Sequence, residues 1–433
     1  MSMILHDSNK KKKKCKGKEA SMQITNIPKE FKKAIPVIQK LNHAGFEAYF
    51  VGGSVRDCIL NLPIHDVDIA TSAFPAEIKA VFDKTIDVGI EHGTVLVLHQ
   101  EESYEITTFR TESTYQDYRR PDHVDFVRSL EEDLKRRDFT INALALDPTG
   151  RVIDLFNGLE DLEQRRLKAV GVAEERFHED ALRMMRGLRF VAQLDFDLEE
   201  KTQVAITNNA FLLSKISVER ICIEFEKMLL GQDAKRAFQL FIATHCYRYC
   251  PGLTNKKTEL MEMVPQLTHH IDDLTVAWCL ILDQLLIEKK QHKAFLKAWK
   301  LSNQRIQEVE LLFQALERVK QDTLTVLDYY SLNETCLKQL AKIATFYGIH
   351  LSETDLLQAY RSLPIHSLKD LAINGNDLMQ ALNRKGGAWL KETLQHCERQ
   401  VLQNEVPNER EPLLDEALEF VKSSDKASNW IFG

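Results

Sequence analysis

The sequence predicts an α+β head, built from a mixed β-sheet with helices, followed by a long all-α region. Strand-like runs alternate with helical segments up to about residue 160, and beyond that point only helical periodicity is recognisable. The length of 433 residues favours several domains. We therefore expect an extension, the head and three helical parts, with the boundaries 1–21, 22–160, 161–231, 232–320 and 321–433.

Composition excludes several classes of protein. Hydrophobic residues make up 44% and charged residues 28%, which is typical of a globular chain with a sizeable core. No run approaches the roughly 18 apolar residues of a membrane span, so we expect no membrane partner. The net charge of −7 allows nucleic-acid binding only through local basic stripes. Eight scattered cysteines favour a reducing compartment and thus a cytoplasmic protein.

The head begins with a helical pattern and continues as short, alternating elements. The first 21 residues, with a lysine run from Lys10 to Lys14, are expected to be a disordered extension; a nucleic-acid tether and a targeting tag are alternatives. The expected elements are a helix at 28–45, a strand at 46–51, a helix at 54–62 capped by Ser54, a strand at 66–71, a hairpin of 93–98 and 104–110, a strand at 123–127, a helix at 139–146 and a strand at 151–156.

The remainder is predicted to be helical, with no strand after about residue 160. Helical periodicity runs through seven segments, at 176–193, 216–230, 233–243, 273–287, 291–300, 303–319 and 377–403.

Two carboxylates flank Val67 on the predicted strand at 66–71. Alternation places Asp66 and Asp68 on one face, roughly 6–7 Å apart. Such a pair can bind two divalent cations, and Mg²⁺ prefers these hard oxygen ligands. A third carboxylate is expected on a neighbouring strand, where Glu105 is the candidate. A bare D-x-D pattern alone is more typical of a solvated strand edge, so the argument depends on what surrounds it.

A glycine pair lies just upstream, at Gly52 and Gly53. Glycines allow a backbone to approach a ligand closely, and the N–H groups at the start of the following helix favour phosphate. Arg56 can pair with a triphosphate oxygen there. Farther along, Arg137 is a candidate ligand for triphosphate or ribose, while Asp138 is expected to cap the helix at 139–146.

A second group of charged residues lies along 176–193, where one occurs at every third position: Asp180, Arg183, Arg186 and Arg189. On one helix these side chains form a stripe, for which a solvated, ion-paired face is the structural alternative. A carboxylate beside a guanidinium matches the donor and acceptor edge of cytosine and adenine and mismatches uracil and guanine. Asp180 and Arg183 therefore form a candidate protein template that selects C and A.

The motifs together resemble the class II tRNA nucleotidyltransferases, the CCA-adding enzymes of the polymerase-beta-like superfamily. They are GGSVRD (52–57), DVDIAT (66–71), RRDFTINA (136–143), EDALRMMR (179–186) and SVERICIEFEKMLL (217–230). The resemblance implies a polymerase-beta-like palm in the head and a helical neck, body and tail. It also implies addition of C, C and A to tRNA with release of pyrophosphate, Mg²⁺ at Asp66 and Asp68, and a tRNA-binding tail.

By the same resemblance, seven residues bind CTP or ATP: Gly53, Arg56, Arg137, Asp180, Arg183, Arg186 and Arg189. The His-Asp dipeptides at 6–7 and 65–66 lie outside the helical region, so we expect the bacterial type without an HD domain.

Several alternatives stay open. An A-only or CC-only enzyme, a poly(A) polymerase and a non-catalytic RNA-binding protein are the competing functions. The long polar segment 110–123 favours complete CCA addition, because CC-adding members of the family lack a flexible loop in the head. The sequence does not fix the oligomeric state, and a homodimer is left open.

Overall fold

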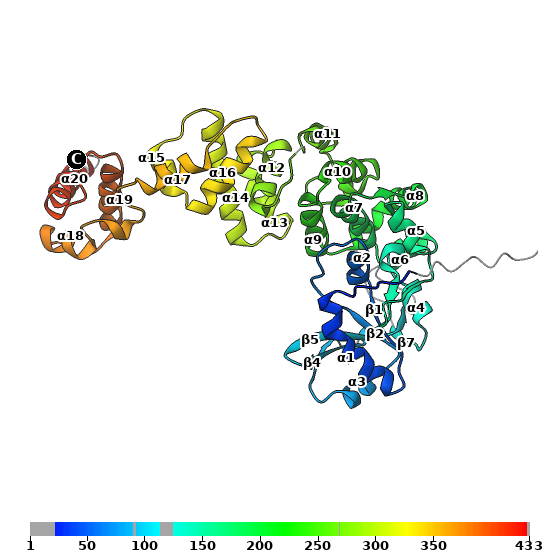
Figure 1. The fold of residues 1–433 in the computed structure, drawn as a ribbon. Helices are drawn as coiled ribbons and strands as arrows, with labels where there is room; N and C mark the ends of the chain where they lie inside the picture. The colour runs from blue at the N-terminus through cyan, green and yellow to red at the C-terminus, as the bar shows by residue number, and fades with distance from the viewer. Residues whose placement is uncertain (1–21, 90–91, 113–123, 268, 431–433) are drawn as a thin grey trace, which may run out of the picture. The chain divides into compact units, whose positions relative to one another are not determined.

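The computed structural model describes residues 22–89, 92–112, 124–267 and 269–430, with the backbone alone for 424–430. The chain forms two compact units (Figure 1). The first comprises Met1–Glu224 with Leu240–Cys250, and the second comprises Phe225–Gln239 with Pro251–Gly433. The finer division of the helical region at residues 231 and 320 stays a prediction.

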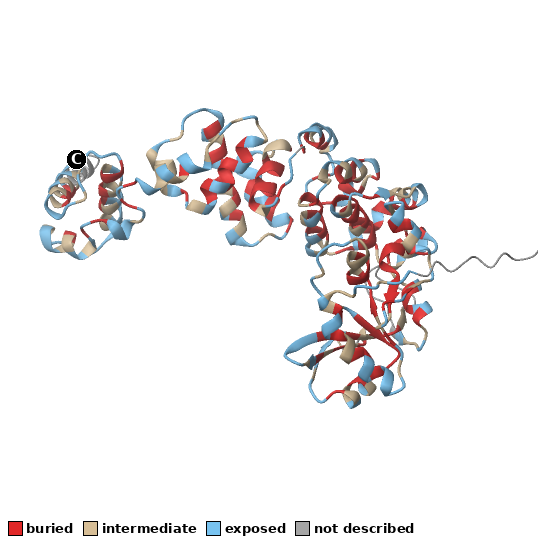
Figure 2. Cartoon of the chain, viewed as in Figure 1, coloured by how far each residue is buried: buried red, intermediate tan, exposed pale blue. Residues whose placement is uncertain are grey.

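The head contains a mixed sheet, which has seven strands in the described part of the chain. Its spatial order is β3 (Thr85–Gly89), β4 (Thr94–His99), β5 (Glu102–Thr108), β2 (Ile69–Thr71), β1 (Ala48–Val51), β8 (Leu144–Leu146) and β9 (Val152–Asp154). β2 and β5 pair in parallel, whereas the other neighbours are antiparallel. The central strands are buried, while the outer strand β3 and the tip of the β4–β5 hairpin are exposed (Figure 2).

Helices of the first unit cover the sheet and extend beyond it. They are α1 (Lys29–His43), α2 (Gly53–Ile59), α3 (Pro75–Val81), α4 (Leu130–Lys135), α5 (Gly158–Glu163), α6 (Ala173–Glu179), α7 (Leu182–Leu194) and α8 (Glu200–Asn209), with the 3-10 helices η2 (Thr140–Asn142), η3 (Ala210–Lys215) and η4 (Cys246–Tyr249). α4 contributes Leu130 and Leu134 to a core with Val51, Ala70 and Phe109. Two small ladders join β6 (Arg110–Glu112) to β7 (Val124–Phe126) and β10 (Arg166–Leu167) to β11 (Asp197–Leu198).

The second unit is helical throughout its described residues. Two helices, α9 (Val218–Leu229) and α10 (Ala234–Ala243), continue from one unit into the other. The rest are α11 (Lys257–Met263), η5 (Val264–Gln266), α12 (Leu274–Gln284), η6 (Lys289–Gln291), α13 (His292–Ala298), α14 (Asn303–Lys320), α15 (Val326–Ser331), α16 (Glu334–Thr345), α17 (Glu353–Arg361), η7 (Leu368–Asp370), α18 (Gly375–Leu382), α19 (Ala388–Leu402) and α20 (Arg410–Trp430).

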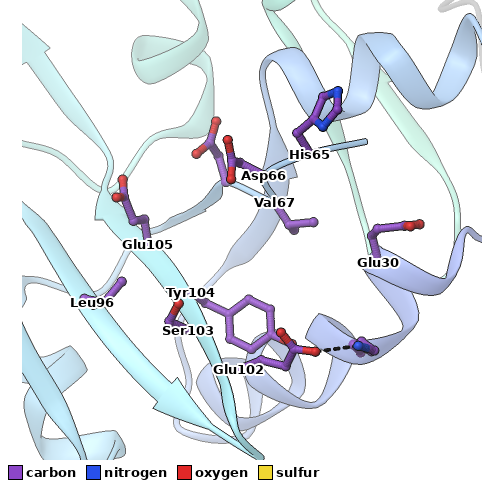
Figure 3. Close-up of a pocket in the computed structure, with 11 residues that line it drawn as sticks. Glu30, His65, Asp66, Val67, Leu96, Glu102, Ser103, Tyr104 and Glu105 are labelled. Carbon is purple, nitrogen blue, oxygen red and sulfur yellow. Dashed lines mark hydrogen bonds and ion pairs between the residues drawn. The ribbon is translucent and has the colours of Figure 1, made fainter. Parts of the chain in front are cut away.

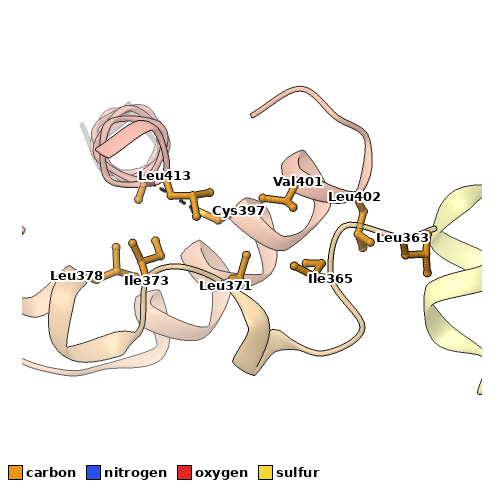
Figure 4. Close-up of a cluster of buried hydrophobic side chains, with 10 residues drawn as sticks. Leu363, Ile365, Leu371, Ile373, Leu378, Cys397, Val401, Leu402 and Leu413 are labelled. Atoms are coloured by element: carbon orange, nitrogen blue, oxygen red, sulfur yellow. Dashed lines mark hydrogen bonds between the residues drawn. The ribbon is translucent and has the colours of Figure 1, made fainter. Parts of the chain in front are cut away.

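The C-terminal end of the second unit has its own apolar cluster (Figure 4). Leu378 of α18, Cys397 and Val401 of α19 and Leu413 of α20 are buried in it together with Ile373. These side chains come from three helices and the segment before them, so burial of apolar surface holds this end of the chain together. Every helix in the described part of the chain is too short or too polar to cross a lipid bilayer.

Three predicted elements in the head are corrected by the structure. The segment 139–146 is a 3-10 turn followed by β8, because a short buried run such as Leu144–Leu146 looks the same in a strand and in a helix. The ladder of β2 begins only at Ile69, so Asp66 and Asp68 precede the strand. Ser54 does not cap α2: Gly52 does, and the Ser54 hydroxyl donates to the carbonyl of Val51 at 3.1 Å.

Three predictions for the later chain also change. The parallel ladder of β10 and β11 contradicts the absence of strands after residue 160, because two-residue strands leave no periodic signal. The segment 176–193 is two helices that break at Asp180, whose backbone is extended. The segment 377–403 is also two helices, and the break begins at Asn383 in the left-handed conformation.

Candidate active site

Asp66, Asp68 and Glu105 line one pocket of about 510 Å³ in the head, together with the carboxylates of Glu30 and Glu102 (Figure 3). Asp66 and Asp68 enter it from the segment before β2, and Glu105 enters it from β5. The parallel register pairs Ile69 with Ile106, which sets Glu105 beside Asp68. The backbone of Asp68 is fixed because its carbonyl accepts the N–H of Val51 at 3.1 Å. The predicted third carboxylate is thus in place on the neighbouring strand.

The electrostatics of Asp68 reflect this crowding. Burial raises the pKa of Asp68, the guanidinium of Arg137 lowers it, and the charges of Glu105 and Asp66 raise it, with a net increase. Across the described residues, no three His, Cys, Asp or Glu side chains are grouped closely enough to hold a metal ion as they stand. The oxygen donors are nevertheless of the kind that Mg²⁺ prefers.

Gly52 connects these carboxylates to the start of α2. Its φ of 75° and ψ of −137° form a conformation that is essentially restricted to glycine. A Cβ there would lie 2.9 Å from Nη1 of Arg137 and 3.8 Å from Oδ2 of Asp68. At Gly53 a Cβ would lie 3.5 Å from Nη2 of Arg56. The two glycines therefore leave room between the backbone, two arginines and a carboxylate.

A buried chain of hydrogen bonds runs from Arg56 to Arg186. Nη1 of Arg56 donates to Asn142 at 2.6 Å, and Asn142 donates to Oδ1 of Asp138 at 3.0 Å. Arg186 donates to Oδ2 of Asp138 through both Nε and Nη2, at 2.8 and 2.6 Å. Burial alone would raise the pKa of Asp138, but the Arg186 charge and the hydrogen bonds hold it well below its usual range. Asp138 therefore joins two segments instead of capping the predicted helix.

The arginine stripe lies on α7 and is not a solvated face. Arg183 and Arg189 are each only 7% exposed. Arg183 donates to Glu179 at 2.6 Å and to the carbonyl of Arg136 at 2.8 Å, and Arg189 pairs with Glu224 at 2.9 Å. Burial lowers the pKa of Arg189 to about 10, although Glu224 opposes this decrease. The solvated-face alternative is therefore wrong for these two arginines.

Asp180 lies just before α7 and has partners of its own. Its Oδ1 accepts the N–H of Leu182 at 3.0 Å, and its Oδ2 accepts from Nη2 of Arg220 at 2.8 Å. The Arg183 side chain is held by other groups, while its backbone N–H donates to the carbonyl of Asp180 at 3.0 Å. Both residues lie at the junction of α6 and α7.

Sequence reasoning missed Glu179, Asn142, Phe190 and Arg220 as members of this site. Asn142, Glu179 and Arg220 lie inside the motifs quoted above, but periodicity gives no sign that Arg220 approaches Asp180 from 40 residues away. At this site, three buried guanidinium nitrogens have no hydrogen-bond partner in the described part of the chain: Nε of Arg137, Nε of Arg189 and Nη1 of Arg220. Unsatisfied buried donors are costly, so they favour an anionic or hydrogen-bonding ligand here.

The segment 113–123 of the predicted mobile loop lies outside the described residues. Its flanks pair as β6 and β7, with Arg110 opposite Phe126. Arg110 also donates to the carbonyl of His92.

Three family models match separate parts of the chain. They are the poly A polymerase head domain over residues 48–168, an RNA- and SrmB-binding site of polymerase A over 195–257, and the tRNA nucleotidyltransferase domain 2 over 269–417.

Curated proteins match at higher coverage. The CCA-adding enzyme of Enterococcus faecalis is 52% identical, over 94% of this chain and 100% of its own length. The CCA-adding enzyme of Ligilactobacillus salivarius is 48% identical, over 92% of this chain and 98% of its own. Among solved structures, the Bacillus stearothermophilus CCA-adding enzyme in complex with CTP has a TM-score of 0.82 and 41% identity. That alignment covers 93% of this chain and 100% of the other.

Proposed function

The chain belongs to the family of CCA-adding enzymes, and from that premise we propose that Asp66, Asp68 and Glu105 bind the divalent cations of its reaction. The enzyme adds C, C and A to the 3′ end of tRNA from CTP and ATP and releases pyrophosphate. The observation that most supports the residue assignment is that Asp66, Asp68 and Glu105 line one pocket, with Asp68 and Arg137 next to the Gly52 turn.

The donor set at the pocket fits Mg²⁺. The carboxylates supply hard oxygen ligands, and burial, together with the charges of Glu105 and Asp66, raises the pKa of Asp68 more than Arg137 lowers it. A divalent cation bound there would polarise the transferred phosphoryl group and acidify the attacking 3′-hydroxyl. The protein's own contribution is to hold Asp66 and Asp68 on a short segment whose backbone is pinned to Val51.

Binding of the triphosphate is assigned to Gly53, Arg56 and Arg137. Gly52 and Gly53 allow the backbone to approach both guanidinium groups closely, and Nε of Arg137 has no partner among the described residues. Arginine pairs well with phosphate because its planar fork donates two parallel hydrogen bonds. The position of Arg137, between Gly52 and Asp68, would set the phosphates next to the carboxylates.

Base selection is assigned to Asp180 and Arg183, with Arg186 and Arg189 on the same helix supporting the nucleotide. A carboxylate has about four acceptor sites, so Asp180 can accept from a base amino group while it keeps Leu182 and Arg220. Arg183 is fixed by Glu179 and Arg136, which limits its freedom to adapt to a wrong base edge. Cytosine and adenine present the matching donor and acceptor order.

The decisive experiment is incubation of tRNA lacking its CCA end with each NTP alone and in combination, followed by sequencing of the products. We expect C, C and A to be added. A-only, CC-only or long A-tailed products would identify the respective alternatives, and unmodified tRNA would favour a non-catalytic RNA-binding protein. Asp66→Ala and Asp68→Ala should abolish addition but keep tRNA binding.

A matched control is Asp87→Ala, in the same sheet, where the carboxylate pairs with Lys79 at the surface. This variant should retain parental activity. Near-normal turnover by Asp66→Ala or Asp68→Ala in Mg²⁺ would contradict the cation assignment, without affecting the assignment of the reaction itself.

tRNA is assigned to the helical region after the head. Its binding should weaken steeply with salt, because lysine and arginine side chains displace counterions from the phosphates. We also assign the protein to the cytosol, since seven cysteines in the described residues are free thiols and a reducing compartment keeps them so.

A further inference from the structure

The ring of Phe190 lies among three guanidinium groups of the proposed nucleotide site. Phe190 is on α7 and only 4% exposed. The guanidinium carbons of Arg189, Arg56 and Arg186 lie 4.2, 5.1 and 5.5 Å from its ring centroid. A cation within about 6 Å of an aromatic ring is attracted by the negative face of the ring.

These arginines come from two different parts of the site. Arg56 follows the glycine pair at the start of α2, whereas Arg186 and Arg189 belong to the stripe on α7. Each is also paired with a carboxylate: Arg56 with Asp57 at 2.8 Å, Arg186 with Asp138 and Arg189 with Glu224. The carboxylates compensate the charges, and the ring of Phe190 is the contact that all three guanidinium groups share.

The ring itself is held in place from its edge. Phe139 meets Phe190 at a centroid distance of 5.8 Å and an interplanar angle of 85°. Phe139 is in turn confined by Gly187, where a Cβ would come within 3.0 Å of the Phe139 ring. Phe190 therefore has little freedom to turn, and its orientation is transmitted to the arginines that surround it.

We propose that Phe190 is a positioning residue, whose ring holds Arg56 on the triphosphate side and Arg186 and Arg189 on the base side in one fixed arrangement. The inference rests on the proposed nucleotide roles of these arginines. Phe190 itself touches no substrate and acts on nucleotide affinity through these three arginines.

The test is steady-state kinetics of Phe190→Leu in the full-length enzyme, with tRNA saturating. Leucine keeps apolar volume but removes the ring, so the KM for both CTP and ATP should rise about tenfold. The kcat should change less than about threefold, because no group at the carboxylates is altered. Inhibition by inorganic tripolyphosphate, which probes the Arg56 side alone, should weaken in parallel.

A matched control separates positioning from simple loss of packing. Phe31 is equally buried and packs on Phe50 at 4.5 Å. Phe31 is not among the residues that line the pocket of Asp66 and Asp68. Phe31→Leu should lower thermal stability to a similar extent and leave both KM values unchanged. An equal rise of KM in Phe31→Leu and Phe190→Leu would overturn the proposal.

A double-mutant cycle tests whether Phe190 acts through Arg56. If it does, the KM increase of the double variant Phe190→Leu, Arg56→Ala should be clearly smaller than the product of the two single increases. Multiplicative effects would show independent roles and overturn the proposal. If Phe190→Leu does not fold, Phe190→Met takes its place, since methionine adapts to irregular core space.

Failure of this inference can be told from failure of the proposed function. Parental KM values for Phe190→Leu, together with an inactive Asp66→Ala, would reject the positioning role alone. If Arg56→Ala binds CTP and ATP as tightly as the parent enzyme, the nucleotide roles on which the inference depends are rejected instead.

Discussion

Arg220 of α9 donates through Nη2 to Oδ2 of Asp180 at 2.8 Å, across 40 residues of sequence. The carboxylate proposed to select the base is therefore oriented by an arginine from a different helix. Arg183, the other proposed template residue, is held by Glu179 and the carbonyl of Arg136. The two side chains that are expected to contact the base are each fixed before a nucleotide arrives, which favours selection by a rigid edge.

Asp180→Ala should affect the choice of nucleotide more than the chemical step. It removes an acceptor for the amino groups of C and A, a charge-assisted hydrogen bond worth about 1.5–3 kcal/mol. The kcat/KM for CTP and ATP should fall about ten- to hundredfold, and discrimination against UTP and GTP should decrease. Measuring kcat/KM for all four NTPs tests this prediction. An unchanged preference for C and A would end the template hypothesis.

Arg220→Ala should reproduce part of that effect without touching the base. Asp180 would keep the N–H of Leu182 but lose the partner that orients its second oxygen. We expect the KM for CTP and ATP to rise about fivefold, because only part of the roughly 1.5 kcal/mol of a hydrogen bond to a charged group is transmitted to the bound nucleotide. The control is Arg165→Ala, which breaks a surface pair with Asp195 and should leave kinetics unaltered. Parental selectivity in Arg220→Ala would show that Asp180 needs no such support.

Gly52→Ala should impair binding of every NTP to a similar extent. The backbone conformation at Gly52 costs a residue with a Cβ about 1–3 kcal/mol, and the new Cβ would displace Arg137 from its position 2.9 Å away. Gly45→Ala is the matched control, since Gly45 has a φ of 90° but nothing within 4 Å of its Cβ position. Both variants should lose stability, and only Gly52→Ala should show raised KM values. Equal kinetics in the two would contradict a role of the Gly52 turn in nucleotide binding.

Local sequence patterns were sufficient for the fold class and for the carboxylates. The β4–β5 hairpin is confirmed, because alternating valine and leucine residues at 94–98 bury Val95 and Val97 on one face. The sequence predicted Glu105 on a strand next to the carboxylate pair. The parallel pairing of β2 with β5 places Glu105 beside Asp68. Such predictions need only the period of a strand and the position of a turn.

The partners of the arginines could not be predicted in this way. Period-three spacing placed Arg183, Arg186 and Arg189 on one stripe, but nothing local indicates whether that stripe faces solvent or a carboxylate from another segment. Asp138 and Glu224 supply those carboxylates from 48 and 35 residues away. The error at 139–146 has the same origin, since Leu144–Leu146 forms a strand only because β1 and β9 flank it.

Asp138→Asn should destabilise the first unit. It should also make the unfolding free energy of this unit less sensitive to acid pH. The carboxamide can still accept from Phe139, but its NH₂ group would face Arg186, leaving a half-buried guanidinium without its partner. Loss of one partner of such a pair costs about 3 kcal/mol at neutral pH. The same isosteric substitution at an exposed ion pair, Asp87→Asn, should lower the unfolding free energy by less than about 0.5 kcal/mol.

The pH dependence of that difference follows from the pKa of Asp138, which lies below its ordinary value of 3.8 in the folded enzyme. A carboxyl group with a lowered folded-state pKa stabilises the fold above the unfolded-state pKa, and loses this contribution as the pH falls toward the folded-state value. The difference in unfolding free energy between the parent and Asp138→Asn should therefore be constant above about pH 5 and shrink below pH 3.8. Asp133, whose pKa is also lowered, titrates in both proteins and cancels from the difference.

The measurement must report on the first unit. All four tryptophans lie in the second unit, so unfolding of the first unit should be followed by hydrogen exchange of the backbone at residues 138–146. Exchange in that segment should accelerate in Asp138→Asn at pH 7 and become similar to the parent in acid, once intrinsic rates are corrected for pH. A difference in unfolding free energy between the parent and Asp138→Asn that stays the same from pH 7 to pH 3 would contradict an ionised Asp138 between Asn142 and Arg186. A carboxyl group that is neutral at both pH values would give such a constant difference.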